Sequence, residues 1–129
     1  MTRRVAVYTS GFAHENPVPA ACRIGQFLFS GVLTGRDAHT HEIPATLDEQ
    51  VANVFDHVRE LLETAGGSTD DIVKMTFWLA DYRNRDALNR HWLTMFPDAA
   101  TRPARQAMAA TFDRGTLVQC DLVAVLSTT

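Results

Sequence analysis

The residue with the clearest capacity for chemistry is an arginine near the end of the chain, Arg105. It lies at the head of an otherwise apolar stretch that is typical of a β-strand. Its guanidinium stays protonated at ordinary pH, and its planar fork can donate two parallel hydrogen bonds to a carboxylate. A partly buried Arg105 therefore needs an acidic partner. This partner is either the carboxylate of a small substrate or, in a structural ion pair, the chain's own Asp121 or Glu49.

A second strand is predicted over residues 117–126, after a polar turn at residues 113–115. Side chains alternate between the two faces of a strand, so Gln119 and Asp121 share one face of it. An amide and a carboxylate side by side on a central strand need partners. We expect Arg105, on the preceding strand, to lie within cross-strand reach of them.

The histidines and cysteines do not form a recognisable site. His39 and His41 would point the same way on an extended segment, but no third or fourth metal ligand lies nearby, and we interpret both as exposed loop residues. Cys22 and Cys120 lie in strand-like runs without metal-ligand spacing, and we interpret them as small buried residues of a reducing compartment. The sequence therefore predicts neither a metal nor a cofactor.

Two helices are predicted. The first follows a capping box formed by Thr46 and Glu49, and Gly66-Gly67 ends it. Its apolar residues recur at steps of three and four along one stripe: Leu47, Val51, Val54, Phe55, Val58, Leu61, Leu62 and Ala65. The second helix is predicted from an N-cap at Asn84 to Phe96, where a proline follows.

The remaining regular segments are predicted strands at residues 5–9, 20–24, 27–32 and 72–80, with a hairpin turn at Gly25-Gln26. In the last of these strands, the alternation assigns Val73, Met75, Phe77 and Leu79 to the helix side and Lys74, Thr76 and Trp78 to the other side.

The strand at residues 27–32 is interrupted by Ser30-Gly31 within an apolar run. Such an interruption predicts a bulge or a close approach of the backbone to a ligand. Ser30 can equally be an ordinary strand serine.

The order of these elements predicts an α+β sandwich, a single domain over residues 1–129 with two helices packed on one face of a mixed sheet. A two-layer domain leaves the other face of its sheet uncovered. That face carries Trp78, Val123 and Val125 with few polar groups, so we expect it to be buried against further copies of the chain. A ring of three copies satisfies this expectation.

Length and charge narrow the class of protein. The chain has 129 residues, with 12 Lys and Arg against 15 Asp and Glu, and its net charge of -3 lacks the basic surface that nucleic-acid binding needs. No apolar run reaches the length of about 18 residues that spans a bilayer, and no secretory leader is recognisable. We therefore expect a cytoplasmic protein.

Several short segments occur in a distinctive order. They are Phe29-Ser30-Gly31, Asp48-Glu49-Gln50-Val51-x-Asn53, Leu62-Glu63-x-Ala65-Gly66, Asp71-Ile72-Val73-Lys74-x-Thr76, Asn89, Phe96-Pro97, Pro103-Ala104-Arg105 and Asp121-Leu122-Val123-Ala124-Val125. In this order, from about Ala20 to Leu126, the chain resembles the RidA/YjgF family. The resemblance implies a chorismate-mutase-like α+β fold and a homotrimer with three clefts between subunits. It also implies hydrolysis of reactive 2-imino or enamine acids to 2-keto acids and ammonia, without a cofactor.

Carried over residue by residue, the resemblance makes Arg105 the clamp of the substrate carboxylate. Ser30-Gly31 match the strand whose backbone lines the pocket. Asn89 and Lys74 match positions near the cleft in many members of the family. The implied partner is thus a small substrate that bears a carboxylate.

The chain also departs from the family pattern. Gln119 stands where deaminating members have a glutamate that positions the attacking water, and Ala107 stands where they often have a cysteine. Gln119 can hold a water through its amide oxygen but cannot accept its proton, so we expect a rate penalty of about 10²–10⁴ unless another base serves. Asp121, Glu15 and His14 of a neighbouring subunit are candidates, and the sequence does not choose among them.

Three functions follow from these observations. The first is an enamine/imine deaminase in which Arg105 holds the substrate and Gln119 the water. The second is a related hydrolase or deaminase that acts on another small carboxylated substrate. The third is a non-catalytic, chaperone-like trimer that binds small acids. An endoribonuclease, a description given to some relatives, ranks last because of the acidic net charge.

Overall fold

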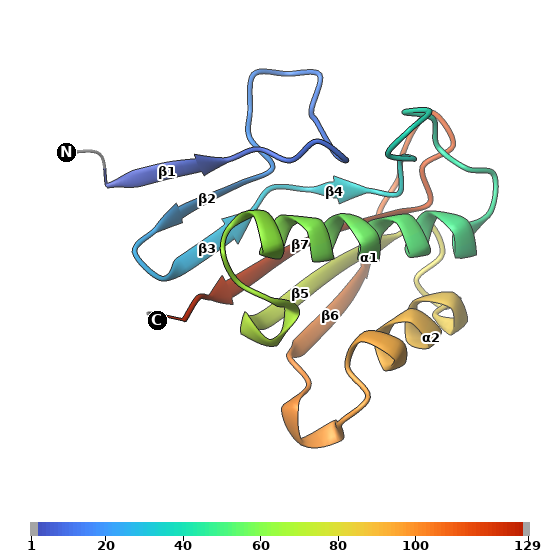
Figure 1. Ribbon diagram of the computed structural model, residues 1–129. Helices are drawn as coiled ribbons and strands as arrows, with labels where there is room; N and C mark the ends of the chain where they lie inside the picture. Colours follow the sequence, from blue (N-terminus) through green and yellow to red (C-terminus); the bar gives the residue numbers. More distant parts are fainter. Residues whose placement is uncertain (1–2, 128–129) are drawn as a thin grey trace.

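A computed structural model describes residues 3–127 as two helices packed on one face of a mixed sheet (Figure 1). The elements are β1 (Arg4–Val7), β2 (Ala21–Ile24), β3 (Phe27–Ser30), β4 (Leu33–Thr34), α1 (Leu47–Thr64), η1 (Thr69–Asp71), β5 (Ile72–Leu79), α2 (Asp86–Met95), η2 (Ala99–Thr101), β6 (Ala104–Ala109) and β7 (Val118–Val125). The strand order is β1-β2-β3-β7-β5-β6, and β4 also pairs with β7. The predicted α+β architecture is confirmed.

Helix α1 begins and ends close to the predicted positions. The Thr46 hydroxyl oxygen accepts a hydrogen bond from the backbone N–H of Glu49 at 3.2 Å, and the hydroxyl donates to the Glu49 carboxylate at 2.9 Å. The stripe from Val51 to Leu62 packs against the sheet, and a fully buried leucine of this kind contributes about 1.5–3 kcal/mol. Within residues 3–127, no helix is both long and apolar enough to cross a membrane.

The predicted hairpin and bulge are present in the first half of the sheet. Gly25 takes a positive φ of 57° at the turn between β2 and β3. From the pair Phe29–Val123 to the pair Leu33–Cys120, the first strand advances by four residues and β7 by three. The extra residue makes a bulge, and the Ser30 hydroxyl accepts a hydrogen bond from the Leu122 N–H at 2.8 Å within it.

Strand β5 contains a second irregularity, which the sequence did not predict. Its pairing with β7 slips between Ile72 and Lys74, so that Ile72 is buried and Val73 is 47% exposed. The assignment of Val73 to the helix side was therefore wrong. Met75, Phe77 and Leu79 do face the helices, as predicted.

The path from β5 to β7 also differs from the prediction. Strand β6 runs parallel to β5 at the edge of the sheet, and β5 lies between β6 and β7. A parallel pair needs a crossover connection, which α2 supplies, and residues 110–117 then return the chain to β7. The expected cross-strand reach of Arg105 to Gln119 and Asp121 is therefore wrong.

Helix α2 begins one residue later than predicted. Arg85 is its N-cap and makes no capping hydrogen bond with its side chain. The backbone N–H of Asn84 instead donates to the Asp81 carbonyl at 3.1 Å, so that Asn84 belongs to the preceding turn. The predicted cap at Asn84 was wrong. The sequence also predicts an apolar stripe of Leu88, Trp92, Met95 and Phe96 on this helix, of which Leu88, Trp92 and Phe96 are buried and Met95 is partly buried.

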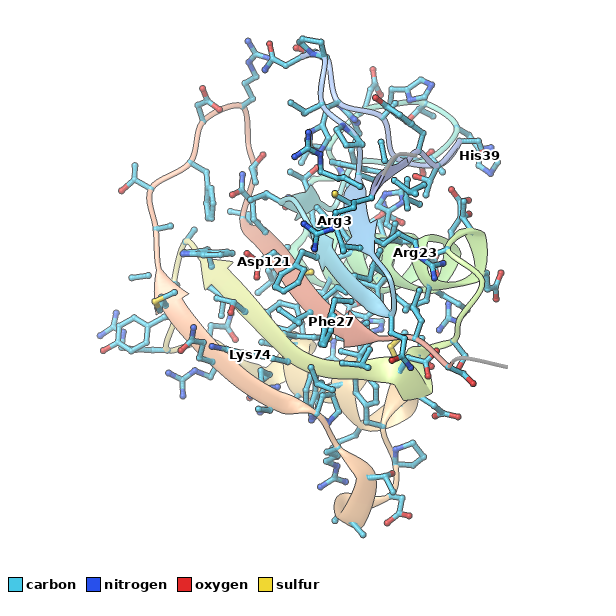
Figure 2. All side chains as sticks on the ribbon, turned by 90° about the vertical axis from the view of Figure 1, so that its left-hand side faces the viewer. Arg3, Arg23, Phe27, His39, Lys74 and Asp121 are labelled. Atoms are coloured by element: carbon cyan, nitrogen blue, oxygen red, sulfur yellow. The ribbon has the colours of Figure 1, made fainter. Side chains whose placement is uncertain are left out.

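The sheet face opposite the helices, called the open face below, is apolar and uncovered in one protomer. Phe27 and Phe29 are 54% and 55% exposed on it, and their cross-strand partners are Val125 and Val123. In Figure 2 the labelled Phe27, Lys74 and Asp121 lie over the strands on the side away from α1. An exposed patch of this kind is typical of an interface between proteins.

Candidate functional site

Arg105 lies on the second residue of edge strand β6, with its side chain on the helix face of the sheet. The centre of its guanidinium lies 5.0 Å from the centre of the Trp92 ring on α2. Its Nη2 donates a hydrogen bond to Asn89 Oδ1 at 2.9 Å, one turn before Trp92 on the same helix. Two of the predicted site residues, Arg105 and Asn89, are thus in direct contact.

The same guanidinium has an unused donor. Arg105 Nη1 is buried and has no hydrogen-bond partner. Burial, and secondarily the positive charge of Arg85, lower the pKa of Arg105 from its usual value, but an arginine stays charged in a protein. The surroundings therefore leave the positive charge of Arg105 incompletely compensated. A carboxylate bound to the guanidinium would accept a hydrogen bond from Nη1 and neutralise this charge.

Neither structural ion pair considered for Arg105 is formed. Arg105 pairs with Met75, and Met75 pairs with Leu122, so these three side chains lie on the helix face of the sheet. Asp121 precedes Leu122 on β7 and therefore points to the open face. Glu49 accepts a hydrogen bond from Thr46 at the start of α1. Among the ion pairs of residues 3–127, none includes Arg105.

Gln119 lies on β7, on the open face of the sheet, and borders two cavities. It is opposite Trp78 on β5 and Thr34 on β4. One cavity, of about 530 Å³, is lined by Trp78 and Phe112 among others and is called the Trp78 cavity below. The second, of about 520 Å³, is lined by His14 and Arg36 among others and is called the His14 cavity. Val32, Asp113, Thr116 and Gln119 border both.

The walls of these cavities are loops, and polar residues of α1 hold them in place. The side chain of Gln50, which is fully buried, donates to the carbonyls of Pro44 and Gly115 at 2.8 and 3.0 Å and accepts from the Leu117 N–H at 2.8 Å. Asn53 donates to the Gly35 carbonyl at 3.0 Å. Sequence reasoning missed this function of Gln50, although a glutamine within the apolar stripe of a helix was the signal for it.

A glycine allows one of these loops to approach the helix. A Cβ atom on Gly35 would lie 2.5 Å from the Gln50 Cα and 2.5 Å from its carbonyl oxygen, closer than any real contact. Only glycine therefore fits at this position, directly after β4. On the same helix, His57 Nε2 donates to the Arg36 carbonyl at 2.6 Å.

His14 is the most unusual side chain of the His14 cavity. Its Nε2 is buried and has no hydrogen-bond partner, and an added Cβ on Gly31 would lie 3.9 Å from it. The imidazole packs edge-on against the Phe12 ring, with 5.0 Å between the ring centres. Burial, followed by the charge of Arg36, lowers the pKa of His14 below its ordinary 6.5. These surroundings therefore favour the neutral imidazole over the imidazolium.

The other predicted site residues lie apart from Arg105. Lys74 is exposed on the open face, near Asp121, whose pKa is raised by burial even though the Lys74 charge opposes the shift. Ser30 is engaged in the bulge, and Gly31 lies near His14. Arg105 lines neither the Trp78 cavity nor the His14 cavity. Within a single chain, the Arg105 guanidinium is thus separate from Gln119 and the two cavities that Gln119 borders.

The side chains that could bind a metal ion or act as nucleophiles include His39, His41 and the two cysteines. His39 and His41 are exposed loop residues, as predicted, and residues 3–127 contain no group of three or more His, Cys, Asp or Glu arranged to hold a metal ion. Both cysteines are free thiols, with Cys120 buried and Cys22 half-buried. Burial, with a contribution from Asp121, raises the pKa of the Cys120 thiol, which makes it a poor nucleophile.

The sequence is similar to a protein-family model and to several known proteins. A protein-family model described as Endoribonuclease L-PSP matches residues 9–126. A RutC family protein of Aquifex aeolicus is 32% identical over 89 residues, which are 69% of this chain and 71% of that protein. A mouse protein named 2-iminobutanoate/2-iminopropanoate deaminase is 26% identical, over 95% of this chain and 91% of the mouse protein.

The fold has a close counterpart among solved structures. The crystal structure of RidA from the Antarctic bacterium Psychrobacter sp. PAMC 21119 matches with a TM-score of 0.87 at 23% identity, over 95% of this chain and 99% of that one. This likeness confirms the predicted chorismate-mutase-like arrangement of two helices on a mixed sheet.

Proposed function

Since the chain belongs to the RidA/YjgF family, whose family model is described as Endoribonuclease L-PSP, we propose that it hydrolyses 2-imino or enamine acids to 2-keto acids and ammonia. The observation that carries this proposal is the Arg105 guanidinium. It is held by Asn89 and Trp92, it has a buried donor without a partner, and no described carboxylate pairs with it. A relative named 2-iminobutanoate/2-iminopropanoate deaminase supports the same chemistry.

The proposed enzyme is a homotrimer with its substrate in clefts between subunits. The support is the open face, where Phe27, Phe29 and Val125 expose an apolar surface that a second copy would bury. The separation of Arg105 from Gln119 within one protomer also requires a second copy if both are to contact one small substrate. In this arrangement Arg105 of one subunit faces the Gln119 region of the next.

Each residue of the site has a separate role in the proposed reaction. Arg105 binds the substrate carboxylate through two parallel hydrogen bonds and so fixes the position of the imine carbon next to it. The backbone around Ser30-Gly31 lines the pocket, and Asn89 keeps the guanidinium in place. Lys74 adds positive charge on the open face of the sheet. Gln119 holds the attacking water through its amide oxygen, and a different group must accept the proton.

The test is turnover of an imine generated in solution. An amino-acid oxidase produces 2-iminopropanoate or 2-iminobutanoate in situ, and semicarbazide competes with the protein for it, so an active deaminase lowers the rate of semicarbazone formation. Loss of two charge-assisted hydrogen bonds, each worth about 1.5–3 kcal/mol, predicts that Arg105→Ala lowers kcat/KM by about 10²–10⁴-fold. Arg59→Ala, at an exposed arginine of α1, is the matched control.

Two outcomes would count against this function. If wild type and Arg105→Ala are equally active, Arg105 does not bind the substrate. If the wild type accelerates the hydrolysis of neither 2-iminopropanoate nor 2-iminobutanoate, the deaminase proposal fails for these substrates.

A binding protein for small acids is the second candidate, because Gln119 brings no proton acceptor of its own. In that case pyruvate would bind in an Arg105-dependent manner without any turnover. Turnover of a different carboxylated substrate would instead identify a related hydrolase. The name of the family model refers to ribonuclease activity, but the net charge of -3 offers no general attraction for a polyanion, and we do not propose it.

A further inference from the structure

Hydrolysis of an imine needs a group that takes a proton from water, and the amide of Gln119 cannot do this. Of the three candidate bases named from the sequence, Asp121, Glu15 and His14, two are unsuited. Asp121 lies on the open face beside Lys74, and it lines neither cavity. Glu15 is an exposed side chain within 4.0 Å of Arg114 Nη1. Asp113 and His41, which also line the His14 cavity, are exposed side chains. The third candidate is His14.

His14 has the position and the protonation state of a general base. It borders the same cavity of about 520 Å³ as Gln119, and its buried Nε2 lacks a partner that would compete for a proton. We propose that His14 is the catalytic base of the imine hydrolysis, acting on a water molecule that Gln119 orients. This assignment rests on the deaminase function proposed above.

The step balances in protons and electrons. The water oxygen attacks the carbon of the protonated imine, the C=N π pair moves to nitrogen, and one water proton passes to His14 Nε2. The resulting imidazolium returns its proton to the amine nitrogen, which raises the leaving ability of that group. The C–N bond then breaks, and the hydroxyl oxygen forms the carbonyl and gives up its proton to Nε2. The imidazolium passes this proton to the departing ammonia, so that ammonium and the 2-keto acid are released and His14 is neutral again.

The surroundings of His14 favour its neutral form. Arg36, whose guanidinium lies 4.7 Å from the centre of the Phe12 ring, is the charged group that acts on His14 most directly. The other titratable groups that line the cavity are Glu15, His41, Asp113 and Arg114, and His57 packs on Phe12 from α1. Burial, and secondarily the charge of Arg36, therefore lower the pKa of His14 and favour the neutral imidazole, which can accept a proton.

The first experiment compares His14→Gln, Gln119→Glu and the double variant with wild type in the imine assay. His14→Gln is expected to lower kcat by about 10²–10⁴-fold with little change in KM, because Arg105 still holds the carboxylate. In the double variant, a carboxylate in the same cavity can accept the proton, and we expect kcat to recover by at least about tenfold. His39→Gln, at an exposed loop histidine, is the control and should behave as wild type.

The second measurement uses wild type alone, so it does not depend on the folding of a variant. The kcat/KM of wild type, which reports the free enzyme, should fall as the pH decreases through the lowered pKa of His14, below 6.5, because protonation removes the base. A nitrogen NMR titration of the imidazole should give the same midpoint. Different midpoints would overturn the assignment.

The possible failures are distinguishable. In the first case, wild type is active, Arg105→Ala is not, and His14→Gln has the kcat and the pH profile of wild type. This result would exclude His14 as the base and leave the deaminase function intact. A wild type without Arg105-dependent turnover sinks the deaminase function, and the assignment of a base falls with it.

Discussion

Replacement of Gln50 by leucine tests how the loops beside Gln119 are held. Gln50 is fully buried and makes three hydrogen bonds, to the Pro44 and Gly115 carbonyls and from the Leu117 N–H. Leucine has a similar volume, so the main loss is these three bonds, which leaves three buried backbone groups without partners. At about 1–1.5 kcal/mol for each group, the free energy of unfolding should fall by about 3–4.5 kcal/mol. This is a large part of the 5–15 kcal/mol typical of a folded protein.

Urea unfolding at one fixed protein concentration measures the loss, because an oligomer's stability depends on its concentration. Gln26→Leu is the matched control, since Gln26 is exposed and donates one hydrogen bond, to the Leu126 carbonyl at 3.1 Å. It should cost less than about 1 kcal/mol. Amide hydrogen exchange should also become faster at Leu117 in Gln50→Leu. Equal losses in the two variants, with unchanged exchange at Leu117, would refute this explanation of how the loop is anchored.

Three further predictions concern the sheet. Phe29→Glu places a charge on the exposed apolar face, so it should reduce the molar mass found by light scattering from a trimer to a monomer; an unchanged trimer would exclude Phe29 from the interface. Because burial raises the pKa of Asp121, its folded state favours the protonated form, and stability is lost as the pH rises through that pKa. Asp121→Asn should therefore unfold at higher urea than wild type at neutral pH, and the difference should shrink below about pH 4; a constant difference would contradict this. A thiol reagent should label Cys120 in urea but not in the native protein, whereas labelling of Cys120 at the same rate in both conditions would contradict its burial.

The sequence was sufficient to predict the elements whose signals are local. The apolar stripe and the capping box of α1 depend on residues three and four positions apart, and the structure confirms both. The Ser30-Gly31 interruption correctly indicated a bulge, because a polar pair inside an apolar strand disturbs the ladder locally. The spacing of apolar residues and the helix caps were therefore enough to predict a layer of helices on a sheet.

The partners of the site residues could not be predicted in the same way, because they depend on strand order. Arg105 and Asp121 are near in sequence but lie on opposite faces, separated by β5, and no period in the sequence encodes this arrangement. The shift at Val73 likewise follows from how β5 pairs with β7. The contact between Arg105 and Asn89 depends on how α2 packs beside β6, and only the family resemblance indicated that both residues lie near a cleft.

The central claim is that Arg105 binds the carboxylate of a small acid in a cleft that a second copy of the chain completes. A crystal structure of the protein with pyruvate tests it most directly. We predict that the carboxylate lies on the Arg105 guanidinium, within reach of the free Nη1 donor, and that the keto carbon faces Gln119 and His14 of a neighbouring copy. Arg105 paired with a carboxylate side chain of another copy, or pyruvate bound elsewhere with Arg105 untouched, would contradict the claim.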